Sequence, residues 1–489
     1  MVAWSTRCAS CRQKRIKCDQ QWPTCGQCLK SKQPCPGPPD RVKFVGENAA
    51  KGSQQTAFID RSEPRRYPLI PVWGELTISP SMPGTRETRV GSELVSLLTS
   101  QATTFGFSSF AQLMRNMPAM LSSSPALTGA VSCLSDARRR QSTFPKPEIK
   151  LDPKLYGSAL RDLRHALQDS YQLERIETLL ATLVMWRVEA TIATTAELPY
   201  LIVTWSVHLS GVGHLLELLG PEAARDELVF RVVLESLSEL ASHFYARNET
   251  FFFASPQWQR VLTIRDSPDI DKLLLKVLSQ MTVFPDLMKD LRRYRVGQAN
   301  YQSLHSRVKS MFKILESVEE PLQIILDDPI LVRKRATSSL LPPVEEIYDT
   351  EDDAVPRTCC LHALSSICTN NMLYSLDGDA TGELERRNYF LSKRTWMFHE
   401  QATKVGSFGM HYYPTALLLT YSSATSRDLE EWIVDMLNLL QERNPATDIM
   451  WTREEVSQRC YATSGNLWPS RQNMRPMTKF PHLDIAAKS

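Results

Sequence analysis

Apolar residues recur along most of this chain at the spacing of an α-helix rather than that of a β-strand. The clearest set falls at positions i, i+4, i+7 and i+11: Tyr156, Leu160, Leu163 and Leu167. The same spacing returns in Ile176, Leu180 and Leu183, and again in Phe230, Leu234, Leu237, Ala241 and Phe244. Such spacing places the side chains of each set on one face of a helix. No sustained alternating run of β-branched residues competes with it, so we predict an all-α body of many helices stacked as irregular hairpins.

Glycine and proline divide this helical pattern. Gly220 followed by Pro221 is a helix-ending signal, so a helix is expected to stop there. Residues 36–88 carry eight prolines in 53 residues, about two and a half times the frequency of the whole chain. Proline at this density blocks regular structure and favours extended segments, and this stretch is therefore expected to be a linker.

The chain before that linker holds six of the eleven cysteines. Their spacing is C-x2-C-x6-C-x6-C-x2-C-x6-C, a repeat of C-x2-C-x6-C with an offset of 17 residues: Cys8, Cys11, Cys18, Cys25, Cys28 and Cys35. A C-x2-C pair can turn around one tetrahedral ion, and cysteine ligation without histidine favours zinc in a closed, structural site. Six thiolates cannot give four private ligands to each of two ions. Two of them must bridge if two ions are bound.

Two alternatives to a structural zinc site are a disulfide-stapled module and a metallothionein-like metal store. The disulfide module needs an oxidising compartment, and the start of the chain, residues 1–7, has no apolar stretch that would direct secretion. A polar segment of roughly 28 residues needs either metal or disulfides to fold. Structural zinc therefore remains the favoured interpretation.

Charge is unevenly distributed between this cysteine-rich head and the rest. Residues 1–45 hold nine Lys and Arg against two Asp, a net charge of +7, whereas the remainder carries −4. This asymmetry is typical of a protein with one polyanion-binding end. The longest apolar runs, near residues 179–186 and 416–419, are shorter than the ~18 residues that span a bilayer, so no membrane association is expected.

Four of the six residues between Cys11 and Cys18 are basic: Arg12, Lys14, Arg15 and Lys17. A solvated charged face is the usual fate of such a run. It is disfavoured here because metal would hold both ends of the segment and there is little core for it to cover. A rigid basic helix suits the major groove of DNA, where Arg and Lys contact guanine.

Residues 8–36 closely resemble the fungal zinc binuclear cluster (Zn2Cys6) transcription factors, in the six cysteines, the basic run and Pro23. The resemblance implies that Cys8 and Cys25 bridge two structural Zn²⁺ ions. Cys11 and Cys18 would complete one ion, and Cys28 and Cys35 the other. It also implies that Arg15 and Lys14 contact CGG-type half-sites, while the phosphates are contacted by Arg12, Lys17, Lys30 and Lys32. The expected partners are double-stranded DNA and the transcription machinery or coregulators, in the nucleus.

The chain is expected to divide into a DNA-binding domain (1–38), a Pro-rich flexible linker (39–88), a helical regulatory domain (89–445) and a partly ordered tail (446–489). The regulatory domain resembles that of the same family more loosely, through the order of its apolar segments. No heptad pattern follows the cysteines through residue 88. The protein is therefore expected either to form a homodimer through the helical domain or to bind as a monomer.

Other candidate chemistry in the body is weak. Gly211 and Gly213 begin a dinucleotide-binding motif, but its third glycine is absent. We therefore favour the interpretation that they are small residues at a contact between helices. A loose group of Cys359, Cys360, His362 and Cys368 fits buried core residues better than a second metal site.

The stretch 344–353 mixes acids with Ile347 and Tyr348, which suits an acidic surface loop better than an activation segment. The C-terminal aromatic residues fit equally a segment docked on the body and a coactivator-binding tail.

No catalytic motif was found, so no enzyme is predicted. The sequence predicts a nuclear, sequence-specific DNA-binding regulator of RNA polymerase II transcription. The alternative is a chromatin-tethered scaffold or effector-sensing cofactor, whose helical domain recruits partners with little sequence specificity.

Overall fold

The computed structural model describes residues 10, 11, 14, 16–18, 26–31, 84–100, 109–143, 152–192, 207–247, 249–263, 269–328, 332–335, 344, 346–350, 353–404, 412–442 and 450–465. The chain divides into two compact units, a cysteine-rich head and a helical body, and each is described by itself. In the head, the described helix is α2 (Gly26–Lys30).

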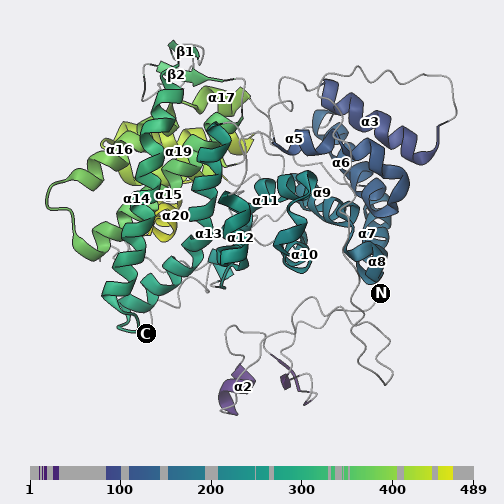
Figure 1. The fold of residues 1–489 in the computed structure, drawn as a ribbon, viewed down its shortest axis with the longest axis horizontal. Helices are drawn as coiled ribbons and strands as arrows, with labels where there is room; N and C mark the ends of the chain where they lie inside the picture. The colour runs from purple at the N-terminus through teal and green to yellow at the C-terminus, as the bar shows by residue number, and fades with distance from the viewer. Residues whose placement is uncertain are drawn as a thin grey trace. The chain divides into compact units, whose positions relative to one another are not determined.

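The first part of the body is a stack of helices around α9 (Figure 1). Its elements are α3 (Arg86–Ser100), α5 (Ser109–Met114), η1 (Met117–Ser123), α6 (Pro125–Thr143), α7 (Pro153–Gln168), α8 (Ser170–Leu173), α9 (Ile176–Ile192) and α10 (Val207–Ala223). Helix α9 packs against α6, α7, α8, α10 and α11. Every position from 176 to 188 is buried, because a helix that is apolar on nearly all sides must be surrounded by other elements.

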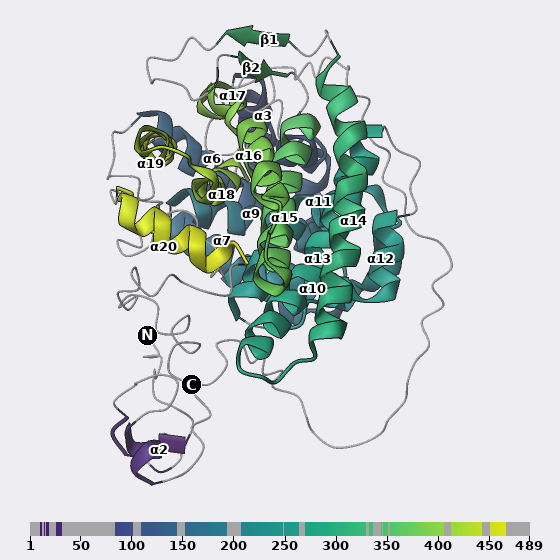
Figure 2. The same cartoon turned by 90° about the vertical axis from the view of Figure 1, so that its left-hand side faces the viewer.

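The second part is arranged around α15, which lies between α14 and α16 (Figure 2). Its elements are α11 (Glu227–Arg247), η3 (Phe252–Ala254), α12 (Pro256–Thr263), α13 (Asp269–Arg295), α14 (Tyr301–Leu326), β1 (Val332–Arg335), β2 (Glu346–Asp349), α15 (Ala354–Asp377), α16 (Glu383–Trp396), α17 (His399–Lys404), α18 (Tyr413–Thr420), η4 (Tyr421–Ser423), α19 (Arg427–Glu442) and α20 (Arg453–Thr463). Helix α15 also contacts α13 and α18, and nearly all of its residues from Val355 to Leu373 are buried.

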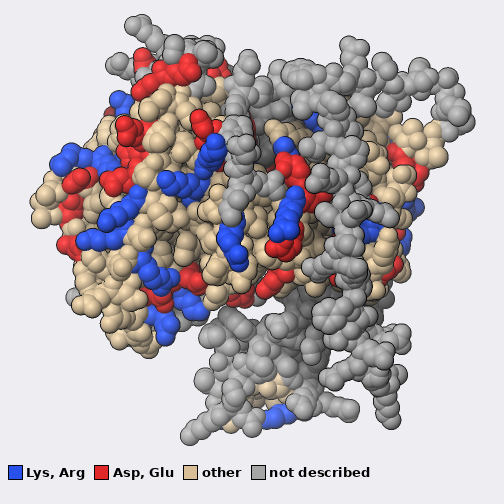
Figure 3. All heavy atoms as spheres, in the orientation of Figure 1, with Lys and Arg blue, Asp and Glu red and all other residues tan. Residues whose placement is uncertain are grey.

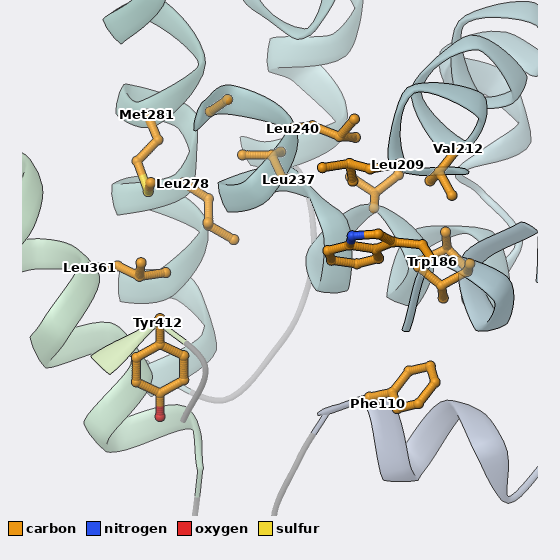
Figure 4. Packing of buried hydrophobic residues seen from close by; sticks show 14 of the residues in the cluster. Phe110, Trp186, Leu209, Val212, Leu237, Leu240, Leu278, Met281, Leu361 and Tyr412 are labelled. Atoms are coloured by element: carbon orange, nitrogen blue, oxygen red, sulfur yellow. The ribbon is translucent and has the colours of Figure 1, made fainter. Parts of the chain in front are cut away.

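One continuous hydrophobic core runs through both parts, from Val90 to Cys460. Figure 4 shows part of this core, where Trp186 of α9 lies beneath Leu209 and Val212 of α10, with Phe110 of α5 on its other side. Burying one such side chain contributes about 1.5–3 kcal/mol. The body is therefore held by its own packing.

The helical expectation is confirmed, including the predicted helix end. Leu163 of α7 is buried, and Tyr156, Leu160 and Leu167 pack partly buried against the core. Helix α10 is interrupted at Gly220, whose φ of 74° is outside the helical region. Glycine reaches this left-handed conformation without steric cost.

A small departure from the all-helical expectation occurs at β1 and β2, which pair antiparallel. The stretch 344–353 was expected to be an acidic surface loop, with an activation segment as the alternative. The structure instead buries Ile347 and Tyr348 of β2. The Tyr348 backbone N–H donates to the Met397 carbonyl at 2.8 Å, and its ring lies 5.0 Å from that of Phe398. The two apolar side chains therefore anchor the strand to the body and cannot serve as exposed contacts.

The start of the C-terminal segment docks on the body. Trp451 is buried, and the Asn438 side chain bonds both its backbone N–H and its carbonyl. Thr452 and Glu455 form a capping box at the start of α20, which satisfies two backbone N–H groups there. Ordered structure thus continues past residue 445, whereas Trp468 and Phe480 lie outside the described residues.

Within the described residues, no helix combines the length and apolar character needed to cross a bilayer.

Candidate metal centre and DNA-binding surface

The head brings three of the six expected metal ligands together. Cys11, Cys18 and Cys28 form a buried cluster of their own, with exposed fractions of 1%, 6% and 3%. Cys28 lies in the middle of α2. The other three expected ligands, Cys8, Cys25 and Cys35, lie outside the described residues.

Backbone hydrogen bonds shape the segment between Cys11 and Cys18. The Lys14 N–H donates to the Ser10 carbonyl, and the Ile16 N–H donates to the Cys11 carbonyl, each at 3.0 Å. The first bond has helical spacing, whereas residues 16–18 are not helical. The described part of the expected basic helix is therefore a short turn that ends before Cys18.

The described lysines of the head are exposed, in contrast to its buried cysteines. Lys14, Lys17 and Lys30 are exposed while Cys11 and Cys18 are buried. Arg12, Arg15 and Lys32 lie outside the described residues. The segment therefore directs sulfur inward and positive charge outward, as a metal-held DNA-binding element requires.

The cysteines that the structure describes in the head are suitable zinc ligands. A small, polar head has few apolar side chains for a core, yet it buries three cysteines in one cluster. Thiolate sulfur is the ligand that zinc favours in closed structural sites. The described residues contain no set of three metal-binding side chains close enough to hold an ion. The complete ligand set stays a prediction.

The loose group of Cys359, Cys360, His362 and Cys368 in the body does not form a metal site. His362 has an imidazole Nε2–H that donates to the Leu315 carbonyl at 2.9 Å, while its Nδ1 accepts from Arg394 Nη2 at 2.9 Å. Burial, aided by the Arg394 cation, lowers the pKa of His362 to about 3. The Cys368 thiol points to the Thr463 carbonyl.

Burial also raises the pKa of Cys359 to about 12, so this thiol stays protonated at neutral pH. The group consists of core residues, as favoured from the sequence.

The paired glycines of α10 serve helix packing. A Cβ atom at Gly211 would come within 3.2 Å of Thr182, and one at Gly213 within 3.0 Å of Leu240. Their small size therefore lets α10 approach α9 and α11 closely, and this confirms the packing interpretation over the dinucleotide motif.

Comparison with protein families gives two matches. Residues 6–43 match the fungal Zn(2)-Cys(6) binuclear cluster domain, and residues 97–271 match the fungal specific transcription factor domain. The second match runs from α3 to the start of α13. No curated protein and no solved structure matches the chain.

These two matches support a transcription regulator. Its cysteine-rich domain binds two zinc ions, and they are structural.

Proposed function

We propose that this protein is a nuclear, sequence-specific DNA-binding regulator of RNA polymerase II transcription that reads CGG-type half-sites in the major groove. One observation carries the proposal: Lys14 and Lys17 are exposed on a turn bounded by the buried Cys11 and Cys18. A metal-fixed turn of this kind presents cations at fixed positions, as base-edge readout requires.

The proposed metal ligands are the six cysteines of the head, with Cys8 and Cys25 bridging the two ions. Base contacts are assigned to Arg15 and Lys14. Phosphate contacts are assigned to Arg12, Lys17, Lys30 and Lys32. A single module of this size offers a small interface, so tight specific binding requires a second reader.

The second reader is proposed to come from a homodimer that forms through the helical body. The proposed domains are 1–38 for DNA binding, 39–88 as linker and 89–445 for regulation and recruitment of coregulators. The body is proposed to act through such contacts and to carry no catalytic activity.

A randomised-sequence DNA selection with the full-length, zinc-loaded protein tests the proposal. Enrichment of paired CGG-type motifs at a fixed spacing is expected. A lone half-site would reject dimeric readout but keep sequence-specific binding. Absence of any enriched sequence at low and high salt would reject direct readout and favour the scaffold alternative.

Substitutions in the basic turn separate base contacts from phosphate contacts. Arg15→Ala should relax sequence preference, costing about 1–3 kcal/mol on the selected site and little on other sequences. Lys17→Ala should weaken binding to all sequences alike and reduce the slope of log K against log salt by roughly 0.9. Binding isotherms on selected and scrambled duplexes at several salt concentrations measure both. Identical behaviour of the two variants would contradict the assignment.

A further inference from the structure

One face of helix α16 concentrates positive charge around an exposed aromatic ring. The residues of this face lie at positions i, i+4, i+7 and i+8: Arg386, Phe390, Lys393 and Arg394. This spacing brings their side chains to one side of a helix. Figure 3 shows Lys and Arg side chains gathered over α14 and α16, with acidic residues among them. Within the described part of the chain, no carboxylate pairs with any of the three cations on this face.

Arg394 is the unusual member of the face because it is buried. Only 3% of the residue is exposed. Its one polar partner is the His362 imidazole, and its Nε and Nη1 atoms have no hydrogen-bond partner. A buried guanidinium without a counter-ion is costly, since buried charges are normally paired or hold a ligand.

The neighbouring arginine shows the contrast. Arg387 of the same helix bonds Glu316 at 3.0 Å and Glu319 at 2.6 Å, both on α14. The glutamates of α14 thus neutralise Arg387, while Arg394 is left with a neutral imidazole. His362 cannot supply the missing negative charge in either protonation state.

A half-exposed aromatic ring lies next to the Arg394 guanidinium. The Arg394 guanidinium carbon lies 5.6 Å from the centroid of the Phe390 ring, and Phe390 is 44% exposed. A half-exposed side chain on a helix surface can change rotamer on a fast timescale. The exposed Arg386 and Lys393 flank this ring on the same face.

From this arrangement we propose that the α16 face binds a small oxyanion carrying two or more negative charges, such as a polycarboxylate or a phosphate. Rotation of the Phe390 ring gives one oxygen access to the free N–H groups of Arg394. Arg386 and Lys393 pair with the outer charges. This site goes beyond the DNA-binding proposal and does not depend on it.

Calorimetric titration and thermal unfolding of the full-length, zinc-loaded protein test the site, with citrate and inorganic phosphate as probes and NaCl to hold ionic strength constant. A saturable heat and a rise in Tm are expected, because a ligand that binds only the folded state stabilises it. Arg394→Gln should raise Kd at least ~10-fold, as loss of a charge-assisted hydrogen bond does.

The variant pair Arg386→Gln with Lys393→Gln keeps the test decisive if Arg394→Gln does not fold, because both residues are exposed. It should also raise Kd. Lys154→Gln, an exposed lysine on α7, removes one charge elsewhere on the body and should leave Kd unchanged.

Equal affinities in wild type and both α16 variants would overturn the proposal. So would the absence of saturable binding of either probe to the wild-type protein.

Discussion

At the scale of single residues, burial and hydrogen bonds fix the protonation state of a histidine inside the body. His362 is wholly buried, and its two ring nitrogens are committed to Leu315 and Arg394. Because Arg394 can only donate, His362 Nδ1 must accept and Nε2 must carry the proton. The neutral tautomer is therefore part of the folded state.

This state predicts a pH dependence of stability. The folded pKa of His362, about 3, lies below its ordinary value of 6.5, so below 6.5 the unfolded chain binds more protons. Its contribution is complete above about pH 6.5 and is lost as the pH falls toward 3. The loss approaches about 1.4 kcal/mol per pH unit in that window. Urea unfolding near neutral pH and near pH 5 should show a steeper loss in wild type than in His362→Gln. Equal losses would contradict the assignment.

A second prediction at this scale concerns Gly465, where α20 ends against α15. Its φ is 82°, and a Cβ atom there would lie 2.8 Å from the Cys368 carbonyl oxygen. Gly465→Ala should therefore combine backbone strain with a steric clash. Gly297 is the matched control, with φ of 73° and nothing within 4 Å of an added Cβ. Gly297→Ala should lose about 1–2 kcal/mol from strain alone, and Gly465→Ala clearly more, in chemical unfolding. Similar losses would show that the contact relaxes.

At the scale of elements, α9 and α11 are joined through an ion pair in the core. Arg187 of α9 pairs with Glu235 of α11, and both are buried. The Arg187 guanidinium also lies over the rings of Trp186 and Phe110, at 4.2 and 5.3 Å from their centroids. The pair sets how these helices meet because each charge needs the other once it is removed from water.

Breaking one side of this pair should be severe. Glu235→Gln removes the carboxylate that pairs with the buried Arg187, and a loss of about 3–5 kcal/mol in the free energy of unfolding is expected. The double change Arg187→Met with Glu235→Leu removes both charges and should recover most of that loss. Denaturant unfolding of the two variants measures the difference. A double variant no more stable than Glu235→Gln would show that packing, rather than charge, governs the site.

At the scale of the whole molecule, the head and the body are stabilised in different ways. The body contains a continuous apolar core, whereas the head has a cluster of three buried cysteines in its described part. A module with so little apolar interior depends on metal for its fold. Head and body should therefore respond differently to loss of zinc.

Zinc removal tests this division. Chelation, or Cys18→Ala, should unfold the head and abolish DNA binding, while the body keeps its helical circular dichroism and its thermal transition. Mobility shift and circular dichroism on the same samples provide both readouts. Unchanged DNA binding after complete zinc removal would refute the metal-dependent head.

Local spacing along the chain determines the helices and the metal chemistry of this protein. The cysteine repeat alone indicated zinc, since ligand chemistry depends on residue type and short-range spacing. Apolar periodicity likewise predicted helices such as α7 and α9, and Gly220 predicted an interruption. These features are set by interactions between residues close in the chain.

Long-range contacts decided the rest, because they join residues that no local pattern relates. Tyr348 is anchored by Met397 and Phe398, about fifty positions later, so an acidic stretch became a strand with two buried side chains. Trp451 is bound by Asn438, and Arg394 meets His362 across two helices. Spacing within the chain could establish the helices and the metal chemistry. Which polar groups are buried, paired or left without a partner was settled only when distant helices packed together.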